Sequence, residues 1–256
     1  MSWSWSRAAC ARDDTRAASA DGPPFAVRRS KALSSFEGRR RARILARVEP
    51  ADIVRGVVVT LAGYLIGGIP WGIIVARAMG RPDPRTVGSG RTGGANVLRA
   101  AGSRAAIVAG FLDLLKGSAV VLLARLVGAG LLFEILAALA AILGHSRSPY
   151  IGFAGGRGVA PALGSLLVMY PPLAAAAVAV YLAVFFIGRY SSLASLSASA
   201  VVGLIAILLV TSALLPPLYL LYAVGGTGLI WLFHWDNIVR LVRGQERRVG
   251  PPSGSV

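Results

Sequence analysis

The sequence predicts an all-α polytopic membrane protein with about seven transmembrane helices, two of them short. Hydrophobic residues make up 55% of the 256 residues, and the mean hydropathy is +0.65, which exceeds the usual apolar content of a soluble domain. The apolar residues gather in long runs between short polar loops, as in helical membrane proteins. They do not alternate with polar residues, which argues against an outer-membrane β-barrel.

Residues 1–50 differ in composition from the rest of the chain. They contain eleven Lys or Arg and five Asp or Glu residues, without a sustained apolar run. This composition predicts a disordered basic N-terminal tail rather than a signal peptide. Residues 245–256 are short and polar, and we expect a second disordered tail there.

A membrane-embedded domain is expected over residues 51–244, where seven apolar segments follow one another. A helix needs ~20 residues to cross a bilayer, so the third and fourth segments are too short to cross alone. Both are rich in small residues, which favours close packing against neighbouring helices. The segments are residues 56–79, 104–127, 131–144, 159–170, 173–188, 193–212 and 218–233.

The basic residues of the domain predict its orientation. Arginines occupy the loops after the first, third and fifth segments and the end of the chain, whereas the connections near residues 128–130, 171–172 and 216–217 have none. The positive-inside rule then places the arginine-bearing loops in the cytoplasm and the N-terminus outside. The basic tail conflicts with this orientation, which we base on the loops.

The net charge of +16 is explained by the basic residues in the loops beside the membrane spans and in the tails. Basic loops beside membrane spans bind anionic headgroups, so we predict membrane lipids and no nucleic acid as partners. The single cysteine, Cys10, excludes an internal disulfide and a cysteine-based metal site. We predict no metal site.

A glycine-rich loop over residues 87–99 is the first candidate site. Glycine lets backbone amides turn toward an anion, and guanidinium groups can hold that anion through paired hydrogen bonds. The loop therefore predicts phosphate binding at the membrane surface. Its candidate residues are Ser89, Gly90, Arg91, Gly93, Asn96 and Arg99.

A second glycine-rich turn, Gly155-Gly156-Arg157-Gly158, precedes the fourth apolar segment. The N-terminus of a helix offers free amides and a favourable dipole to phosphate. The turn does not match the GxxxxGK[ST] pattern of a P-loop. A flexible re-entry turn without a ligand is the alternative.

Two pairs of ionisable residues remain. Asp113 and Lys116 share a helix face within the second segment, and either a functional role or a structural ion pair would explain them. His145 and His234 are the only histidines, and two separated histidines do not make a zinc site. For both we favour ligand binding over proton transfer.

Taken together, these motifs resemble the bacterial acyl-phosphate:glycerol-3-phosphate acyltransferases. The resemblance covers residues 57–244 and keeps the family's order of motifs. It rests on residues 89–99 (SGRTGGANVLR), on Asp113 with Lys116-Gly117, and on residues 144–160 with their glycine-rich turn. Residues 64–70 and the final motif from His234 through Asn237 to Gly244 fit as well.

The resemblance implies a seven-helix enzyme of the bacterial inner membrane with its active site facing the cytoplasm. Such enzymes transfer a fatty acyl group from acyl phosphate to the 1-hydroxyl of glycerol 3-phosphate, giving lysophosphatidate and phosphate in the first step of phospholipid synthesis. They need no cofactor, and no protein partner is indicated. By motif position, the residues implied to hold the phosphates are Ser89, Arg99, Arg157, Ser192, His234 and Asn237. Together with the candidates above, the predicted phosphate-binding set is Ser89, Gly90, Arg91, Gly93, Asn96, Arg99, Lys116, Gly155, Gly156, Arg157, Gly158, Ser192, His234 and Asn237.

The chain departs from the family pattern at Arg91, Ala95, Arg157 and Pro161, where the family usually has Asn, Thr, Lys and Thr. An arginine in place of lysine keeps the charge but changes the geometry. No side chain is assigned as a catalytic base. An acyl phosphate is already activated, so we expect its own oxygens to take the proton while the protein orients the reactants.

Three other functions are compatible with the sequence. A transporter of a small phosphorylated anion would also have short helices and intramembrane charges, and a diverged paralogue or a non-catalytic scaffold would share the apolar pattern. The polar clusters gather at one membrane face, and few charges lie in the spans. This distribution favours the enzyme.

Overall fold

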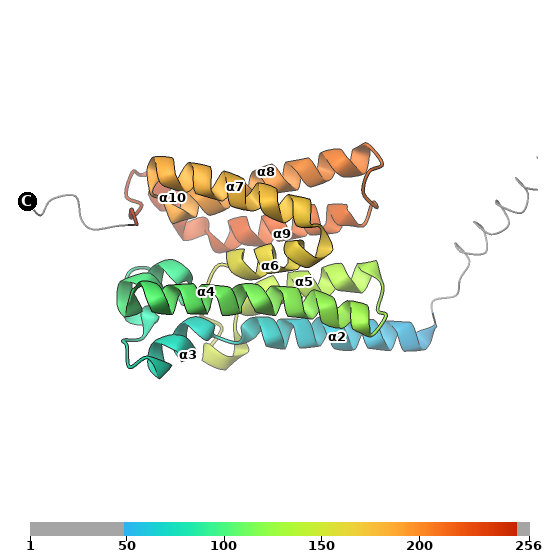
Figure 1. The fold of residues 1–256 in the computed structure, drawn as a ribbon, viewed down its shortest axis with the longest axis horizontal. Coiled ribbons are helices and arrows are strands. Elements are labelled where there is room, and N and C mark those ends of the chain that lie inside the picture. Colours follow the sequence, from blue (N-terminus) through green and yellow to red (C-terminus); the bar gives the residue numbers. More distant parts are fainter. Residues whose placement is uncertain (1–48, 250–256) are drawn as a thin grey trace, which may run out of the picture. The chain divides into compact units, whose positions relative to one another are not determined.

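The protein is described by a computed structural model over residues 49–249, and every regular element in that range is a helix (Figure 1). The predicted N-terminal tail lies outside the described residues except for its last two. The helices are α2 (Pro50–Gly68), α3 (Trp71–Ala78), α4 (Gly94–Leu126), α5 (Leu131–Ser146), α6 (Val159–Met169), α7 (Pro171–Gly188), α8 (Ser191–Thr211), α9 (Tyr219–Phe233) and α10 (Trp235–Val242), with short 3-10 turns η1 (Pro84–Thr86) and η2 (Pro149–Ile151).

The helices confirm the predicted fold class. Five stretches are long and apolar enough to cross a membrane, and they are Pro50–Ala78, Gly94–Leu126, Leu131–Ile151, Pro171–Gly188 and Ser191–Thr211. The shorter apolar helices are α6 and α9. The prediction of a short segment at 159–170 is confirmed by α6. The segment predicted at 131–144 is α5, whose 16 residues reach spanning length only together with η2.

Two other predicted boundaries also differ from the structure. The first apolar segment is broken at Ile69 and Pro70 into α2 and α3, since proline has no N–H group to continue a helix. Helix α4 begins at Gly94, before the predicted residue 104, but it consists of two helices joined across a kink at Gly102, whose φ of 85° is open to glycine but strained for other residues. The part after the kink agrees with the predicted start.

The helices pack in two sets on either side of α5 and α6. Helix α2 packs against α5, α3 and α6 pack against α4, and α7, α8 and α9 form a second set of neighbours. Figure 1 shows α5 and α6 between the set of α2, α3 and α4 and the set of α7, α8 and α9. Because successive long helices run in opposite directions, the arginine-bearing loops all lie at one end.

Glycines let some of these helices touch through their backbones. A Cβ on Gly164 of α6 would overlap the carbonyl oxygen of Leu114 in α4, and one on Gly117 of α4 would overlap that of Pro161 in α6. Small residues allow such close approach in membrane proteins, where packing rather than water exclusion holds helices together. These contacts fix α6 against α4.

We predict that Gly164→Ala destabilises the protein by about 1–3 kcal/mol or more, because the added methyl group would force α6 away from α4. The measurement is thermal or denaturant unfolding of the purified protein in detergent. Gly228→Ala in α9 is the matched control, since no atom lies within 4 Å of its added Cβ. Equal stability of the two variants would contradict the close packing of α4 and α6.

Candidate functional site

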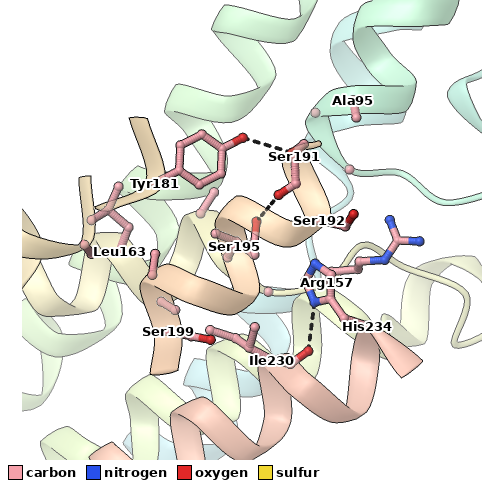
Figure 2. Close-up of a pocket in the computed structure, with 18 of the residues that line it drawn as sticks. Ala95, Arg157, Leu163, Tyr181, Ser191, Ser192, Ser195, Ser199, Ile230 and His234 are labelled. Atoms are coloured by element: carbon pink, nitrogen blue, oxygen red, sulfur yellow. Dashed lines mark hydrogen bonds between the residues drawn. The ribbon is translucent and has the colours of Figure 1, made fainter. Parts of the chain in front are cut away.

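A cavity of about 690 Å³ lies between the two sets of helices. At one end it is lined by polar and charged residues from the arginine-bearing loops. From there it continues between the apolar faces of α6, α7, α8 and α9. Figure 2 shows Arg157 and His234 near the polar end and Ser195, Ser199 and Leu163 along the wall.

The glycine-rich loop before α4 is organised by Asn96, which is buried. Its amide nitrogen donates to Ser89 Oγ at 3.1 Å and to the Arg91 carbonyl at 2.9 Å, and its oxygen accepts from Arg99 at 3.0 Å. Gly88 and Gly90 have φ of +62° and +69°, which is why glycine stands at both positions. Asn96 thus shapes the loop as well as lining the cavity.

The same loop ends at the first turn of α4. Gly93 precedes the helix, and its carbonyl accepts from the Asn96 and Val97 amides. Gly94 and Ala95 follow and line the cavity. The first amides of a helix have no partner within the helix and favour an anion. The structure therefore places a helix N-terminus at the polar end of the cavity.

Arg157 enters the cavity from the loop before α6. Its guanidinium group donates to Asp236 of α10 at 3.1 Å, and Arg240 lies 3.4 Å from the same carboxylate. Burial lowers the pKa of Arg157, and Asp236 opposes that shift. Burial would raise the pKa of Asp236, but the positive charges of Arg157 and Arg91 outweigh burial and lower it. The pair is therefore ionised, with Arg91 close by.

The proline at position 161 fits its place in the chain. Pro161 is the third residue of α6, where the backbone N–H of any residue would lack a partner within the helix. Proline costs no helical hydrogen bond there, and it leaves no hydroxyl group at the position. The Gly158 residue before α6 has φ of +83°, which favours glycine.

Glu246 places a carboxylate at the polar end of the cavity, a role that was not predicted from the sequence. One oxygen accepts from Ser192 Oγ at 2.8 Å and from the Asn237 amide at 2.6 Å, and the other accepts from Arg240 at 2.8 Å. Glu246 lies in the segment 245–256 that we expected to be a tail. The only signal in the sequence is that it is the sole acidic residue after Asp236.

His234 is buried at the end of α9. Its Nδ1 lies 2.8 Å from the Ile230 carbonyl oxygen (Figure 2), and because a carbonyl only accepts, Nδ1 carries the proton. Burial lowers the pKa of His234 to about 4, and the positive charge of Arg157 acts in the same direction. The imidazole is therefore neutral at physiological pH, and Nε2 can accept a hydrogen bond.

Lys116 differs from its predicted role. It is 4% exposed and does not line the cavity. Its amino group lies 2.8 Å from Asp113 Oδ1 and donates to the Ile69 carbonyl at 3.0 Å and to His145 Nδ1 at 2.9 Å. These partners leave no donor for a phosphate, so the structural ion pair is the interpretation that the contacts favour.

The structure brings most of the predicted residues to the cavity wall, and it adds Arg240, Glu246 and Arg247. It does not place Gly90, Lys116, Gly155 or Gly156 on that wall. Gly155 and Gly156 rest instead on His145, because a Cβ on either would overlap the backbone or ring of that histidine. The predicted residues that line the cavity are Ser89, Arg91, Gly93, Asn96, Arg99, Arg157, Gly158, Ser192, His234 and Asn237.

The polar end of the cavity is strongly cationic. Five arginines line the cavity, against two carboxylates, Glu246 and Asp113. Among the described residues, no group of three or more His, Cys, Asp or Glu residues is arranged to hold a metal ion. Arginines and helix amides bind phosphate and carboxylate groups well. The cavity therefore suits a ligand with one or more anionic groups beside an apolar chain.

Known proteins are similar to this chain in sequence and in fold. A family profile described as glycerol-3-phosphate acyltransferase matches residues 57–244. A glycerol-3-phosphate acyltransferase of Rubrobacter xylanophilus is 43% identical over 198 residues, which cover 77% of this chain and 97% of the relative. One from Nitrobacter winogradskyi is also 43% identical, over 203 residues, 76% of this chain and 96% of the relative.

Two crystal structures are similar as well. One is of PlsY (YgiH), an integral membrane glycerol 3-phosphate acyltransferase, in its glycerol 3-phosphate form. It is 36% identical, has a TM-score of 0.70, and matches 76% of this chain and 96% of its own. The lysophosphatidic acid form is 35% identical, with a TM-score of 0.69 and coverage of 76% and 95%.

We predict that Lys116→Met destabilises the protein by about 3–5 kcal/mol, because it leaves the Asp113 carboxylate buried without a positive partner. The measurement is denaturant unfolding in detergent. The double variant Asp113→Asn with Lys116→Met should recover much of the loss, since it removes both charges. A single variant as stable as the unmodified protein would show that the buried pair contributes nothing.

Proposed function

Since this chain belongs to the glycerol-3-phosphate acyltransferase family of integral membrane proteins, we propose that it transfers a fatty acyl group from acyl phosphate to the 1-hydroxyl group of glycerol 3-phosphate. The products are lysophosphatidate and inorganic phosphate. The reaction takes place at the cytoplasmic face of the bacterial inner membrane, where the arginine-bearing loops lie under the positive-inside rule.

The shape of the cavity is the observation that carries this proposal. It joins an arginine-lined end to a long apolar groove between α7, α8 and α9. An acyl phosphate has the same two parts, a phosphate and a hydrocarbon chain. Glycerol 3-phosphate would add a second phosphate at the cationic end. PlsY, with forms named for glycerol 3-phosphate and lysophosphatidic acid, supports the choice of acceptor and product.

The two phosphates divide the polar end between them. We assign one to the α4 side, where Ser89, Arg91 and Arg99 stand beside the first amides of the helix. We assign the other to Arg157, Ser192 and Asn237, which come from the loop before α6, from α8 and from α10. Glu246 and Asp236 balance part of the positive charge, and the remaining charge of the arginines is available to the two phosphates.

The transfer itself needs no covalent enzyme intermediate. The 1-hydroxyl oxygen attacks the acyl carbonyl carbon, the bond from that carbon to the phosphate oxygen breaks, and the hydroxyl proton passes to a phosphate oxygen. The arginines stabilise the charge on the leaving phosphate. The main contribution of the protein is to hold two anions side by side in the reacting orientation.

His234 has a positioning role in this scheme. Its neutral ring accepts through Nε2, so it can accept a hydrogen bond from the 2-hydroxyl group of glycerol 3-phosphate and orient the acceptor, which leaves the proton of the 1-hydroxyl group to pass to the phosphate. A pKa near 4 makes it a weak base at physiological pH. It therefore orients the nucleophile without taking the proton in the transfer.

The direct test supplies the purified protein with palmitoyl phosphate and glycerol 3-phosphate. We expect lysophosphatidate and phosphate in equal amounts. Arg157→Met should lower kcat/KM by roughly a hundredfold or more, because it removes a charged donor to a developing anion. Arg125→Met is the control, since Arg125 pairs with Glu134 at the other end of the helices.

Two results would contradict the proposal. One is an absence of turnover with acyl phosphate together with exchange of a phosphorylated solute across liposomes, which would identify a transporter. The other is acylation of glycerol 3-phosphate from a thioester donor but not from acyl phosphate. The second result would keep the acceptor and change the donor.

The pH dependence tests the role of His234. Between pH 5.5 and 8.5 we expect no limb of the kcat/KM profile that belongs to this residue, because a group with a pKa of about 4 stays neutral throughout. His234→Asn keeps a donor toward Ile230 but removes the Nε2 acceptor, so its rate should fall by a similar factor at every pH. An acid limb near pH 6.5 that disappears in this variant, with the KM for glycerol 3-phosphate unchanged, would instead identify a general base.

A further inference from the structure

The apolar part of the cavity has parallel walls from three helices. Each helix contributes residues three or four positions apart, so each presents a single face. On α7 the face runs from Phe185 to Leu173, on α8 from Ser192 to Ala206, and on α9 from His234 to Tyr219. Figure 2 shows part of this wall, with Ser191, Ser195 and Ser199 following one another along α8 and Tyr181 of α7 beside Ser191.

The far end of the cavity is closed by two tyrosines. The hydroxyl of Tyr222 lies 2.6 Å from Ser165 Oγ and donates to the Ala162 carbonyl at 2.9 Å, and that of Tyr219 donates to the Met169 carbonyl at 2.9 Å. Both rings are buried. Moving either ring would leave buried polar groups without partners, so α9 and α6 form a fixed floor.

The cavity is open to the side above its floor. Ile107 of α4 and Val178 of α7 line it and are 71% and 39% exposed. At the floor, Leu173, Ala206 and Tyr222 are all buried. A chain can therefore enter sideways from the lipid, but its tip ends in an enclosed space.

The depth of the cavity can be expressed as a number of carbon atoms. From Ser192 to Ala206, or from His234 to Tyr219, the distance along the helix is roughly 20 Å at a rise of about 1.5 Å per residue. An extended hydrocarbon chain advances about 1.3 Å per carbon, because successive C–C bonds of about 1.5 Å zigzag about its axis. The depth therefore corresponds to about 16 carbons.

We propose that this closed cavity limits the acyl donor to chains of about 16 carbons, and that Ala206, Tyr219 and Tyr222 set the limit. The inference rests on the proposed function, because it takes the apolar groove as the place of the acyl chain. A longer chain must bend or displace the floor. A shorter one leaves apolar wall without contacts.

Substitutions at two depths of α8 test the limit. Ala206→Phe fills the floor, and Val202→Phe blocks the cavity one helical turn nearer the polar end. Because one turn is about 5.4 Å, Val202→Phe should shorten the preferred chain by about four carbons more than Ala206→Phe does. Leu173→Ala should enlarge the floor and raise the relative rate with longer chains. Leu204→Phe is the control on the exposed side of α8.

The measurement is a competition among acyl phosphates of 10 to 20 carbons, with lysophosphatidate species quantified by mass spectrometry. For the unmodified protein we expect the highest kcat/KM near 16 carbons and a loss of about tenfold or more at 20, as a pocket discriminates about tenfold or more for each methylene group that does not fit. Because all chains compete in one reaction, the ratio of products does not depend on how much protein is folded.

The outcomes separate the two proposals. Lysophosphatidate formation with the same chain profile in all variants, or with a flat profile in the unmodified protein, overturns the limit but keeps the function. Absence of lysophosphatidate at every chain length overturns the proposed function and the limit with it. A profile that shifts with Val202→Phe and Leu173→Ala in opposite directions, and not with Leu204→Phe, supports the limit even if Ala206→Phe fails to fold.

Discussion

The amino group of Lys116 connects the parts of the protein that form the site. It neutralises Asp113 on its own helix, satisfies the Ile69 carbonyl where α2 and α3 separate, and contacts the ring of His145 at the end of α5. That ring lies directly against Gly156, and the next residue is Arg157. A single buried charge thus fixes both the break in the first span and the loop that carries a cation into the cavity.

The class of the fold could be predicted from the sequence, because the length and polarity of an apolar run are local properties. The gathering of glycine and arginine clusters at one end followed from the alternation of helix directions. The roles of Lys116 and Glu246 could not be predicted. Each depends on partners that are distant in the chain, and the same charges are equally compatible with a ligand or with an internal pair. Pro70 could be read in the sequence, but a single proline inside an apolar run did not predict that the run divides there into α2 and α3.

Some residues of the site face the ligand, and other residues hold them in position. Asn96 holds the loop of Ser89 and Arg91, and Glu246 holds Ser192 and Asn237 in place. Ser89 accepts from Asn96 and keeps its own hydroxyl hydrogen for a ligand, whereas the one hydroxyl hydrogen of Ser192 is donated to Glu246 and must leave it before Ser192 can donate to a phosphate. Arg91 in place of the usual asparagine adds a charge, and Arg157 in place of the usual lysine keeps one. Neither side chain takes part in the contacts of Asn96 and Glu246, so these supports are undisturbed.

The shortness of α6 also bears on how the protein is made. Its 11 residues reach only about 16 Å, about half of a hydrocarbon core of ~30 Å, so the helix cannot settle in lipid as an independent span. It needs the groove of α4, into which Gly164 and Gly117 let it fit. Because α4 precedes α6 in the chain, that groove is already synthesised when α6 leaves the ribosome. The order of helices in the gene is therefore also a workable order of insertion.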